Sequence, residues 1–157
     1  MRTWAPKGQT PLLNVPLTHD HLSVMSGITL DGRLFLRMQE HAYTAEGVVA
    51  FLQALLEQVE GHLTVIWDGA PIHRSRVIQD FLREGAAKRL HLERLPGYAP
   101  ELNPDEGIWN YLKRVELANV CCRNLAELAE QVRQAEQRVR DQPEIIRACS
   151  QQCGYLV

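Results

Sequence analysis

The chain has 157 residues, a length typical of one domain and sufficient to bury a core without metals or disulfides. Hydrophobic residues make up 45% and charged residues 23%, which excludes a disordered, collagen-like or coiled-coil protein. The formal net charge of −2 argues against a free-standing nucleic-acid-binding module, which is normally strongly basic, although an enzyme with a local basic patch remains compatible. Apolar runs are far shorter than the roughly 20 residues of a membrane helix, and no signal-peptide pattern opens the chain. We expect a cytoplasmic protein that does not contact a membrane.

Four cysteines lie in the last quarter of the chain, at Cys121, Cys122, Cys149 and Cys153. The adjacent pair and the Cys-x3-Cys pair do not match the usual spacings of zinc ligands. We therefore expect free thiols in a reducing compartment.

The first apolar segments predict a β-hairpin. Residues 21–30 and 33–38 show the alternation of strands, and Asp31 and Gly32 join them. An Asp-Gly pair between two such runs indicates a primed turn, whose two central residues both need positive φ. We expect two antiparallel strands joined by this two-residue turn.

Helices and strands then alternate. Residues 44–61 predict a helix that Thr44 caps. Residues 63–67 form a nearly continuous apolar run, typical of a central strand covered on both faces. A second helix is expected over residues 73–84 and another short strand over residues 90–95. The inward-facing residues of that second helix should be Val77, Ile78, Phe81 and Leu82.

The C-terminal part is predicted to be helical. A third helix begins at about Pro104, and a fourth follows Asn124, which forms a capping box with Glu127. Pro143 begins a last short helix.

This order of elements predicts an α/β fold in which one mixed sheet is flanked by helices. We expect a single domain over residues 1–157. Within it, residues 1–20 should be irregular, residues 21–115 should form the core, and residues 116–157 should form C-terminal helices.

Two acidic residues are candidates for a functional site. Asp68 ends the 63–67 strand, and ligands in open α/β sheets bind at the carboxyl ends of strands. Its structural alternative is the N-capping of a helix. Glu106 lies in the first turn of the third helix, where its structural alternative is a favourable interaction with the helix dipole.

The face that Glu106 shares also carries polar residues. At about 100° per residue, Asn110 lies about 40° and Lys113 about 20° from Glu106 around the helix. The residues expected on the opposite, packed side are Ile108, Trp109, Leu112 and Val115. An acid, an amide and a cation are therefore predicted to share one exposed face.

Three segments resemble a known protein family. Residues 95–113, LPGYAPELNPDEGIWNYLK, are similar to the signature around the third acidic residue of insertion-sequence 630 and mariner-type transposases. Residues 65–75, VIWDGAPIHRS, resemble the stretch around the second acidic residue of that family. Residues 2–11, RTWAPKGQTP, resemble the segment just after its first catalytic strand.

The resemblance implies an RNase H-like fold and a catalytic triad of two Asp and one Glu that holds two Mg²⁺ or Mn²⁺ ions. On this basis Asp68 is the second metal ligand of the triad and Glu106 is the third. Two such ions activate the attacking oxygen and stabilise the leaving oxygen. The activity implied is metal-dependent cleavage and transfer of DNA strands at transposon ends.

The chain departs from the family pattern at its beginning. The first catalytic Asp of the family precedes the segment that resembles residues 2–11, and a DNA-binding helix-turn-helix region precedes that Asp. Asp20 and Asp31 lie in a polar bend and in the hairpin turn, so both are interpreted as structural. We therefore expect an N-terminally truncated chain that forms the C-terminal part of a split transposase. We expect this part to be inactive alone and to bind a partner, either the N-terminal part or another copy of itself. The alternative is a non-catalytic remnant that acts only as a folded partner-binding domain.

Further residues are candidates for contacts to DNA or to groups around the metal. They are His73, Arg74, Asn110, Lys113 and Arg114. Cations near a cleaved backbone bind phosphate without reading sequence. The alternatives are capping or packing for His73 and ordinary solvated charges for the cations.

Overall fold

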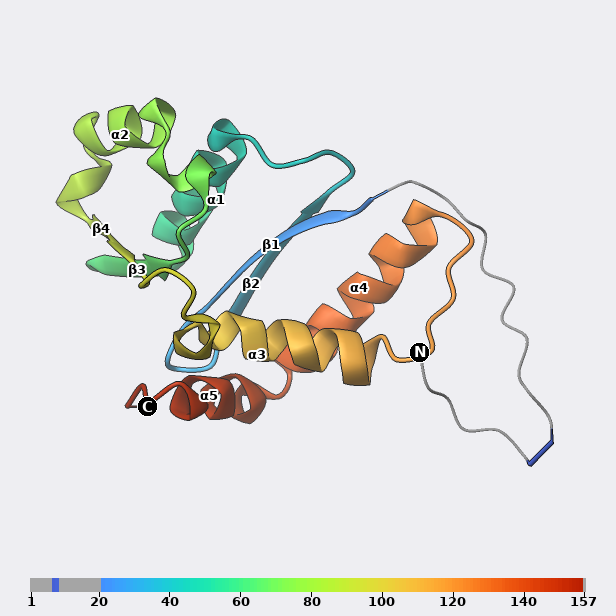
Figure 1. Cartoon of the computed structure of the whole chain (residues 1–157). Coiled ribbons are helices and arrows are strands. Elements are labelled where there is room, and N and C mark those ends of the chain that lie inside the picture. The colour runs from blue at the N-terminus through green and yellow to red at the C-terminus, as the bar shows by residue number, and fades with distance from the viewer. Residues whose placement is uncertain (1–6, 9–20, 157) are drawn as a thin grey trace.

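The computed structural model describes residues 7–8 and 21–156. The expectations for Asp20, for an irregular segment over residues 1–20 and for most of residues 2–11 lie outside the described residues. Figure 1 shows the elements in chain order. They are β1 (Ser23–Ile28), β2 (Leu34–Gln39), α1 (Ala45–Gln58), β3 (Leu63–Trp67), α2 (Arg76–Arg83), β4 (Leu90–Arg94), α3 (Pro104–Tyr111), α4 (Leu125–Arg140) and α5 (Pro143–Gln152).

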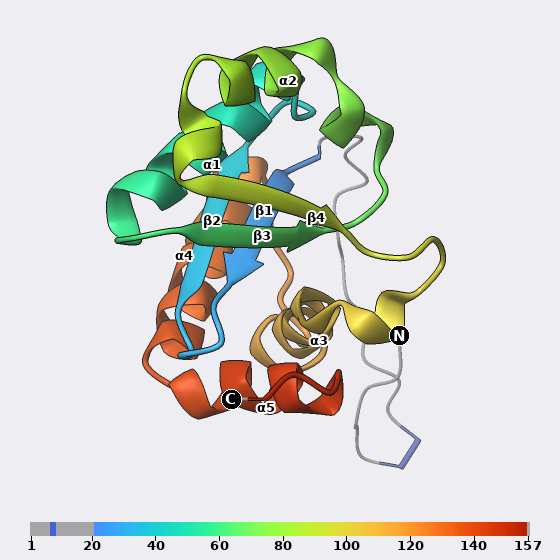
Figure 2. The ribbon, with the colours of Figure 1, turned by 90° about the vertical axis from the view of Figure 1, so that its left-hand side faces the viewer.

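The strands form two separate pairs instead of the one mixed sheet that the sequence predicts. β1 and β2 are antiparallel, with Ser23 opposite Gln39, whereas β3 and β4 are parallel, with Leu63 opposite Leu90. Among the described residues no strand pairs with the second edge of β1 or of β3. In the described part, each pair therefore keeps unpaired backbone donors and acceptors along its two outer edges, which include those of β1 and β3. Figure 2 shows the β3–β4 pair crossing the hairpin.

The hairpin is confirmed, but its primed turn is wrong. Gly32 has a φ of +94°, whereas Asp31 does not have a positive φ. The Gly32 amide donates to the Thr29 carbonyl at 3.0 Å, and the Thr29 amide donates to the Arg33 carbonyl at 3.0 Å. The turn is therefore longer than two residues and needs positive φ only at its glycine, as in three-residue hairpin loops.

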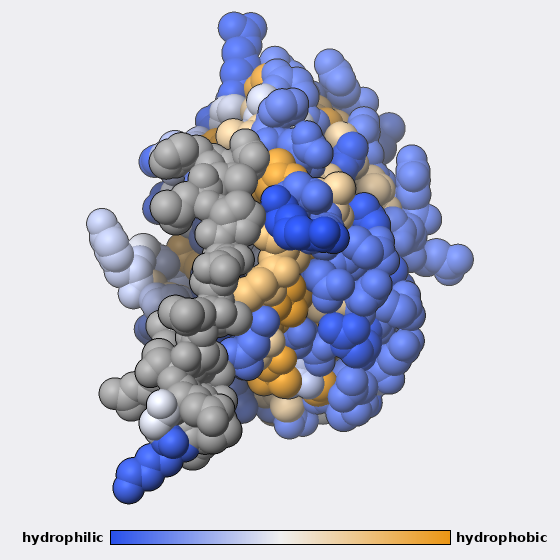
Figure 3. All heavy atoms as spheres, turned by 90° about the vertical axis from the view of Figure 1, so that its right-hand side faces the viewer, coloured by the Kyte–Doolittle hydropathy of each residue, from blue (hydrophilic) through white to orange (hydrophobic). Residues whose placement is uncertain are grey.

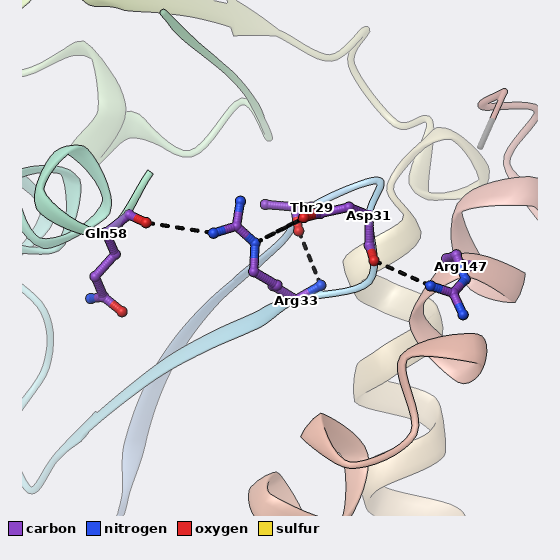
Figure 4. A network of polar contacts seen from close by, with 5 residues as sticks. All are labelled: Thr29, Asp31, Arg33, Gln58 and Arg147. Carbon is purple, nitrogen blue, oxygen red and sulfur yellow. Dashed lines mark hydrogen bonds and ion pairs between the residues drawn. The ribbon is translucent and has the colours of Figure 1, made fainter. Parts of the chain in front are cut away.

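Polar contacts hold this turn between two helices (Figure 4). The Arg33 guanidinium pairs with Asp31 at 3.1 Å and donates to the carbonyl of Gln58 on α1. On the other side, Arg147 of α5 donates to the Asp31 carbonyl at 3.3 Å. A hydrogen bond from the Thr29 side chain, helped by Arg33, lowers the pKa of Asp31. These contacts agree with the structural interpretation of Asp31.

The hairpin is the middle layer of the molecule. Because successive strand residues point to opposite faces, Phe35 packs into a cluster around α1 while Leu34 packs into a second cluster with Ile108 and Ala135. The first cluster also contains Leu90 of β4, so α1 lies against both strand pairs. Helices α3, α4 and α5 cover the other face of the hairpin.

The prediction that β3 is covered on both faces is wrong. Leu63, Val65 and Trp67 pack against the α1 cluster, but Thr64 is exposed and Ile66 is 45% exposed. The apolar run looked continuous because Ile66 is apolar, although its side chain faces outward. Sequence periodicity alone cannot show that an apolar residue is exposed.

The starts of α1 and α4 agree with the sequence prediction, whereas the start of α2 differs from it. The side chains of Thr44 and Asn124 accept from backbone amides three residues later, as expected. Glu127 accepts from the Arg123 amide at 2.8 Å instead of completing the capping box at Asn124. Helix α2 begins at Arg76 after its N-cap Ser75, three residues later than expected.

The segment before α2, Pro71–Arg74, is a 3₁₀ helix. Pro71 stands at its start, where proline has no amide hydrogen to lose. His73 therefore lies on a tight turn next to β3, and not on α2.

Helix α3 continues into a π-helical segment, Leu112–Glu116, in which one residue of the predicted packed side is exposed. Lys113 lies over the Trp109 ring, with Nζ 5.5 Å from its centroid. Glu106, Asn110 and Lys113 are all exposed. Val115 is 55% exposed, although it was expected to pack. A π turn shifts the register of every later residue around the axis, and the expectation assumed continuous α-helix.

The surface of the described part is mixed in polarity. Figure 3 shows a largely hydrophilic face with a band of hydrophobic atoms beside the residues drawn in grey. No helix among the described residues is long and apolar enough to span a membrane. The four cysteines are free thiols; Cys121 is exposed and the other three are half-buried.

Candidate functional site

A groove of about 550 Å³ lies between the two strand pairs. Its walls are residues 24–30, along and just beyond β1, and residues 63–68, along and just beyond β3. We call it the inter-sheet groove. Side chains of α1 line it as well, namely Val48, Phe51, Leu52 and Leu55. The unpaired strand edges therefore border a cavity that is apolar along α1.

Asp68 lies at the end of this groove, directly after β3. Its Oδ1 atom accepts from the Ala70 amide at 2.9 Å and from Nε2 of His73 at 3.2 Å. Its side chain is 62% exposed. The structural alternative of helix N-capping does not apply, because Ser75 caps α2. Asp68 instead closes the turn into the Pro71–Arg74 segment and presents a carboxylate to solvent.

His73 is held against Asp68 by packing. Its ring stacks on Trp67 with centroids 4.2 Å apart and an interplanar angle of 16°. Burial lowers the pKa of His73, and the Asp68 carboxylate partly offsets that effect. Its Nδ1 atom is buried and has no hydrogen-bond partner among the described residues. The stacked ring keeps the Asp68 side chain oriented.

The acidic pair at the start of α3 divides into a buried and an exposed residue. Glu106 is exposed in the first turn. Asp105 lines the groove, and its Oδ2 accepts from Ser26 Oγ at 2.6 Å and from Trp109 Nε1 at 3.1 Å. Its Oδ1 is buried without a partner among the described residues, and burial raises the pKa of this carboxyl.

Sequence reasoning missed Asp105. The only local signal was the four-residue spacing to Trp109, which places the two side chains on one helix face. The contact to Ser26 spans 79 positions and had no local signal.

The expected metal centre is incomplete. The carboxylate oxygens of Asp68 and Glu106 are of the type that Mg²⁺ prefers. However, no three His, Cys, Asp or Glu side chains of the described part gather in a way that could hold an ion. The donor chemistry fits a divalent metal, but the number of ligands falls short of a triad.

Of the expected contact residues, only His73 touches Asp68. Arg74 and Arg114 are exposed and make no ion pair with a described residue. Asn110 is exposed on α3, and Lys113 rests on Trp109. A cation that the sequence did not single out, Arg94, lies beside the residue that follows Asp68.

Residues 1–129 match the family model described as the DDE superfamily endonuclease. The chain belongs to this family. The match includes both Asp68 and Glu106. It covers most of the DDE endonuclease chain and contains the segments 65–75 and 95–113 that resemble the family. No curated protein sequence matches it.

Solved structures of Mos1 transposase share the fold. The Mos1 mariner paired-end complex with Mn has a TM-score of 0.61 at 14% identity, over 98% of this chain and 51% of that one. The Mos1 strand transfer complex has a TM-score of 0.60 at 14% identity, over 100% and 50%. The Mos1 catalytic domain with raltegravir and Mg has a TM-score of 0.54 at 15% identity, over 88% and 83%.

The expected RNase H-like α/β fold and the expected family are confirmed. The DDE endonuclease chain spans about half the length of the Mos1 chains in the paired-end and strand transfer complexes.

Proposed function

We propose that this DDE endonuclease chain is part of a transposase catalytic domain, whose activity is metal-dependent cleavage and transfer of DNA strands in the movement of an insertion sequence. The observation that carries the proposal is the placement of two carboxylates, Asp68 at the carboxyl end of β3 and Glu106 in the first turn of α3. Both lie in the segment that matches the family. The Mos1 relatives of the same fold are a paired-end complex and a strand transfer complex.

In this proposal Asp68 and Glu106 hold divalent ions, Mg²⁺ or Mn²⁺. Two Mos1 structures contain Mn or Mg, which supports this choice. When bound, such ions activate the attacking oxygen and neutralise charge on the leaving one. The Ala70 amide and His73 fix Oδ1 of Asp68, so that the carboxylate keeps one orientation. Arg74, Lys113 and Arg114 supply positive charge for DNA phosphates, with Asn110 as a further polar contact.

We further propose that a partner completes the site. A triad needs a third carboxylate, and the inter-sheet groove offers a place from which to supply it. An extended segment there can pair with the free edge of β1 on one side and with the free edge of β3 on the other. The candidate partner is the N-terminal part of a split transposase, and a second copy of the chain is the other candidate. The chain alone is accordingly expected to be inactive.

A reconstitution experiment tests this function. The chain is mixed with Mg²⁺ or Mn²⁺ and DNA that carries the transposon end, with and without a polypeptide encoded directly upstream. Strand cleavage should require the added polypeptide and should be lost in Asp68→Asn and Glu106→Gln. Asp80→Asn is the matched control, because Asp80 pairs with Arg76 and Arg83 on the outside of α2. Cleavage by the chain alone, or cleavage that survives both substitutions, contradicts the proposal.

The second candidate function is that of a non-catalytic remnant that binds a partner. The inter-sheet groove favours this function independently of the acids, because its two free strand edges need no metal to bind a strand. Metal titration separates the two candidates. Binding of Mn²⁺ that requires both Asp68 and Glu106 supports a residual metal site, whereas partner binding without metal binding supports the remnant.

A further inference from the structure

Arg94 lies beside the residue that follows Asp68. It is the last residue of β4 and lies opposite Trp67 in the β3–β4 ladder. Its guanidinium lies over Gly69, the residue after Asp68. A Cβ placed on Gly69 would be 2.6 Å from Nη2 and 3.0 Å from Nε of Arg94. The missing side chain of Gly69 therefore makes the space in which the guanidinium lies.

The guanidinium is unpaired in this position. Among the described residues it makes no hydrogen bond or ion pair. Two carboxylates lie next to its position in the β3–β4 ladder, but Asp68 binds Ala70 and His73, and Glu93 pairs with His91. An arginine fork carries five N–H donors, and here none of them is used by the described part of the protein.

We infer that Arg94 binds a phosphate of the DNA strand held at Asp68. The inference rests on the proposed function, because it assumes that DNA is the ligand. The planar fork matches two phosphate oxygens at once, which a lysine ammonium cannot do. The site needs such a contact, since Asp68 and Glu106 repel a DNA backbone in a chain whose net charge is −2.

Arg94 differs in this respect from the cations that the sequence singled out. Arg74, Arg94 and Arg114 are all exposed. Of these three side chains, only the Arg94 guanidinium lies against the residue that follows Asp68, so its loss should affect DNA binding at Asp68 more than the loss of a surface charge elsewhere. Its role is to position the strand, not to react.

Fluorescence anisotropy with a short labelled DNA duplex and its single strand, at several salt concentrations, tests the inference. Arg94→Gln should weaken binding about tenfold, as expected for one lost hydrogen-bonded charge contact. The slope of log affinity against log salt should fall by about 0.9 for the duplex or about 0.7 for the single strand. Arg94→Lys should keep most of the slope and lose part of the affinity. Arg76→Gln is the control, because Arg76 pairs with Asp80 on α2.

Gly69→Ala tests the position of the guanidinium directly. The added methyl group would lie 2.6 Å from Nη2, so the guanidinium has to move from this position while its charge stays. The variant should therefore lose part of the affinity that Arg94→Gln loses, and the double variant should bind no more weakly than Arg94→Gln. Equal slopes for Arg94→Gln and the wild type, or an equal loss in Arg76→Gln, would overturn the inference while leaving the proposed function standing. A wild-type chain that binds neither DNA at low salt would contradict the proposed function itself.

Discussion

Replacing Gly32 in the hairpin turn by alanine is expected to destabilise the protein strongly. Gly32 has a φ of +94°, and an added Cβ would lie 2.8 Å from both the Cβ and the carbonyl oxygen of Pro143. The carbonyl belongs to the backbone at the start of α5 and cannot rotate away. Gly61 provides the matched control, because its φ is +79° and a Cβ there meets nothing within 4 Å.

The two substitutions share one cost and differ in another. Placing an L-residue in the left-handed region costs about 1–2 kcal/mol, of which about 0.4–1 kcal/mol is recovered by stiffening the unfolded chain. Gly61→Ala should therefore lose about 1 kcal/mol. Gly32→Ala should lose a further 1–3 kcal/mol or so, because the overlap with Pro143 is a case of overpacking. That difference is a large part of the roughly 5–15 kcal/mol that usually stabilises a domain.

Urea unfolding of both variants measures the difference. The midpoints should separate while the m-values stay equal, because neither change alters the surface exposed on unfolding. Thermal midpoints should differ by roughly 2–4 °C for each kcal/mol at this chain length. Equal losses in the two variants would refute the reasoning, since they would mean that the turn does not lie against α5. The polar contacts of the turn with α5 in Figure 4 would then also be in doubt.

Two further predictions concern packing and pH. Gly107→Ala places a Cβ 2.8 Å from Sγ of Cys149 on α5. The expected loss of stability is about 1 kcal/mol, the cost of overpacking less the gain in helix propensity. This loss should shrink in the double variant with Cys149→Ala, and strictly additive unfolding free energies would show that the two helices are not in close contact. Burial raises the pKa of Glu136 above 4.5, partly offset by its ion pair with Arg140. The folded state therefore keeps this proton longer, and stability falls as pH rises from 4.5 through the raised pKa. Glu136→Gln should remove that fall, and parallel pH profiles of unfolding free energy in the two proteins would contradict it.

Short-range features of the fold could be predicted from sequence because each depends on a few neighbouring residues. Thr44 and Asn124 cap their helices through amides three positions on, and Pro104 and Pro143 stand at helix starts. The hairpin followed from its two apolar runs. Its turn type did not, because an Asp-Gly pair fits both a two-residue primed turn and a three-residue loop whose glycine alone has positive φ.

The candidate site shows the same division. Asp68 was placed correctly at the end of a strand, because the apolar run before it is local. The burial of Asp105 depends on Ser26, 79 positions away, and no local pattern encodes such a contact. Arg94 lies beside Gly69 because β4 pairs with β3 and places Arg94 opposite Trp67. This pairing joins residues 27 positions apart, so the local sequence around Asp68 does not indicate it. Whether Asp68 and Glu106 carry the chemistry stays a prediction.

The place of the hairpin between two apolar clusters has a consequence for how the molecule can open. Phe35 belongs to the cluster on the α1 side and its neighbour Leu34 to the cluster of α3, α4 and α5. The two strand pairs share no backbone hydrogen bond in the described part, so α1 and these side chains transmit cooperativity between them. Release of β2 would uncover both clusters at once, which makes local opening there nearly as costly as global unfolding. Slow amide exchange should therefore be concentrated in β2, while the groove-facing amides of β1 and β3 exchange early.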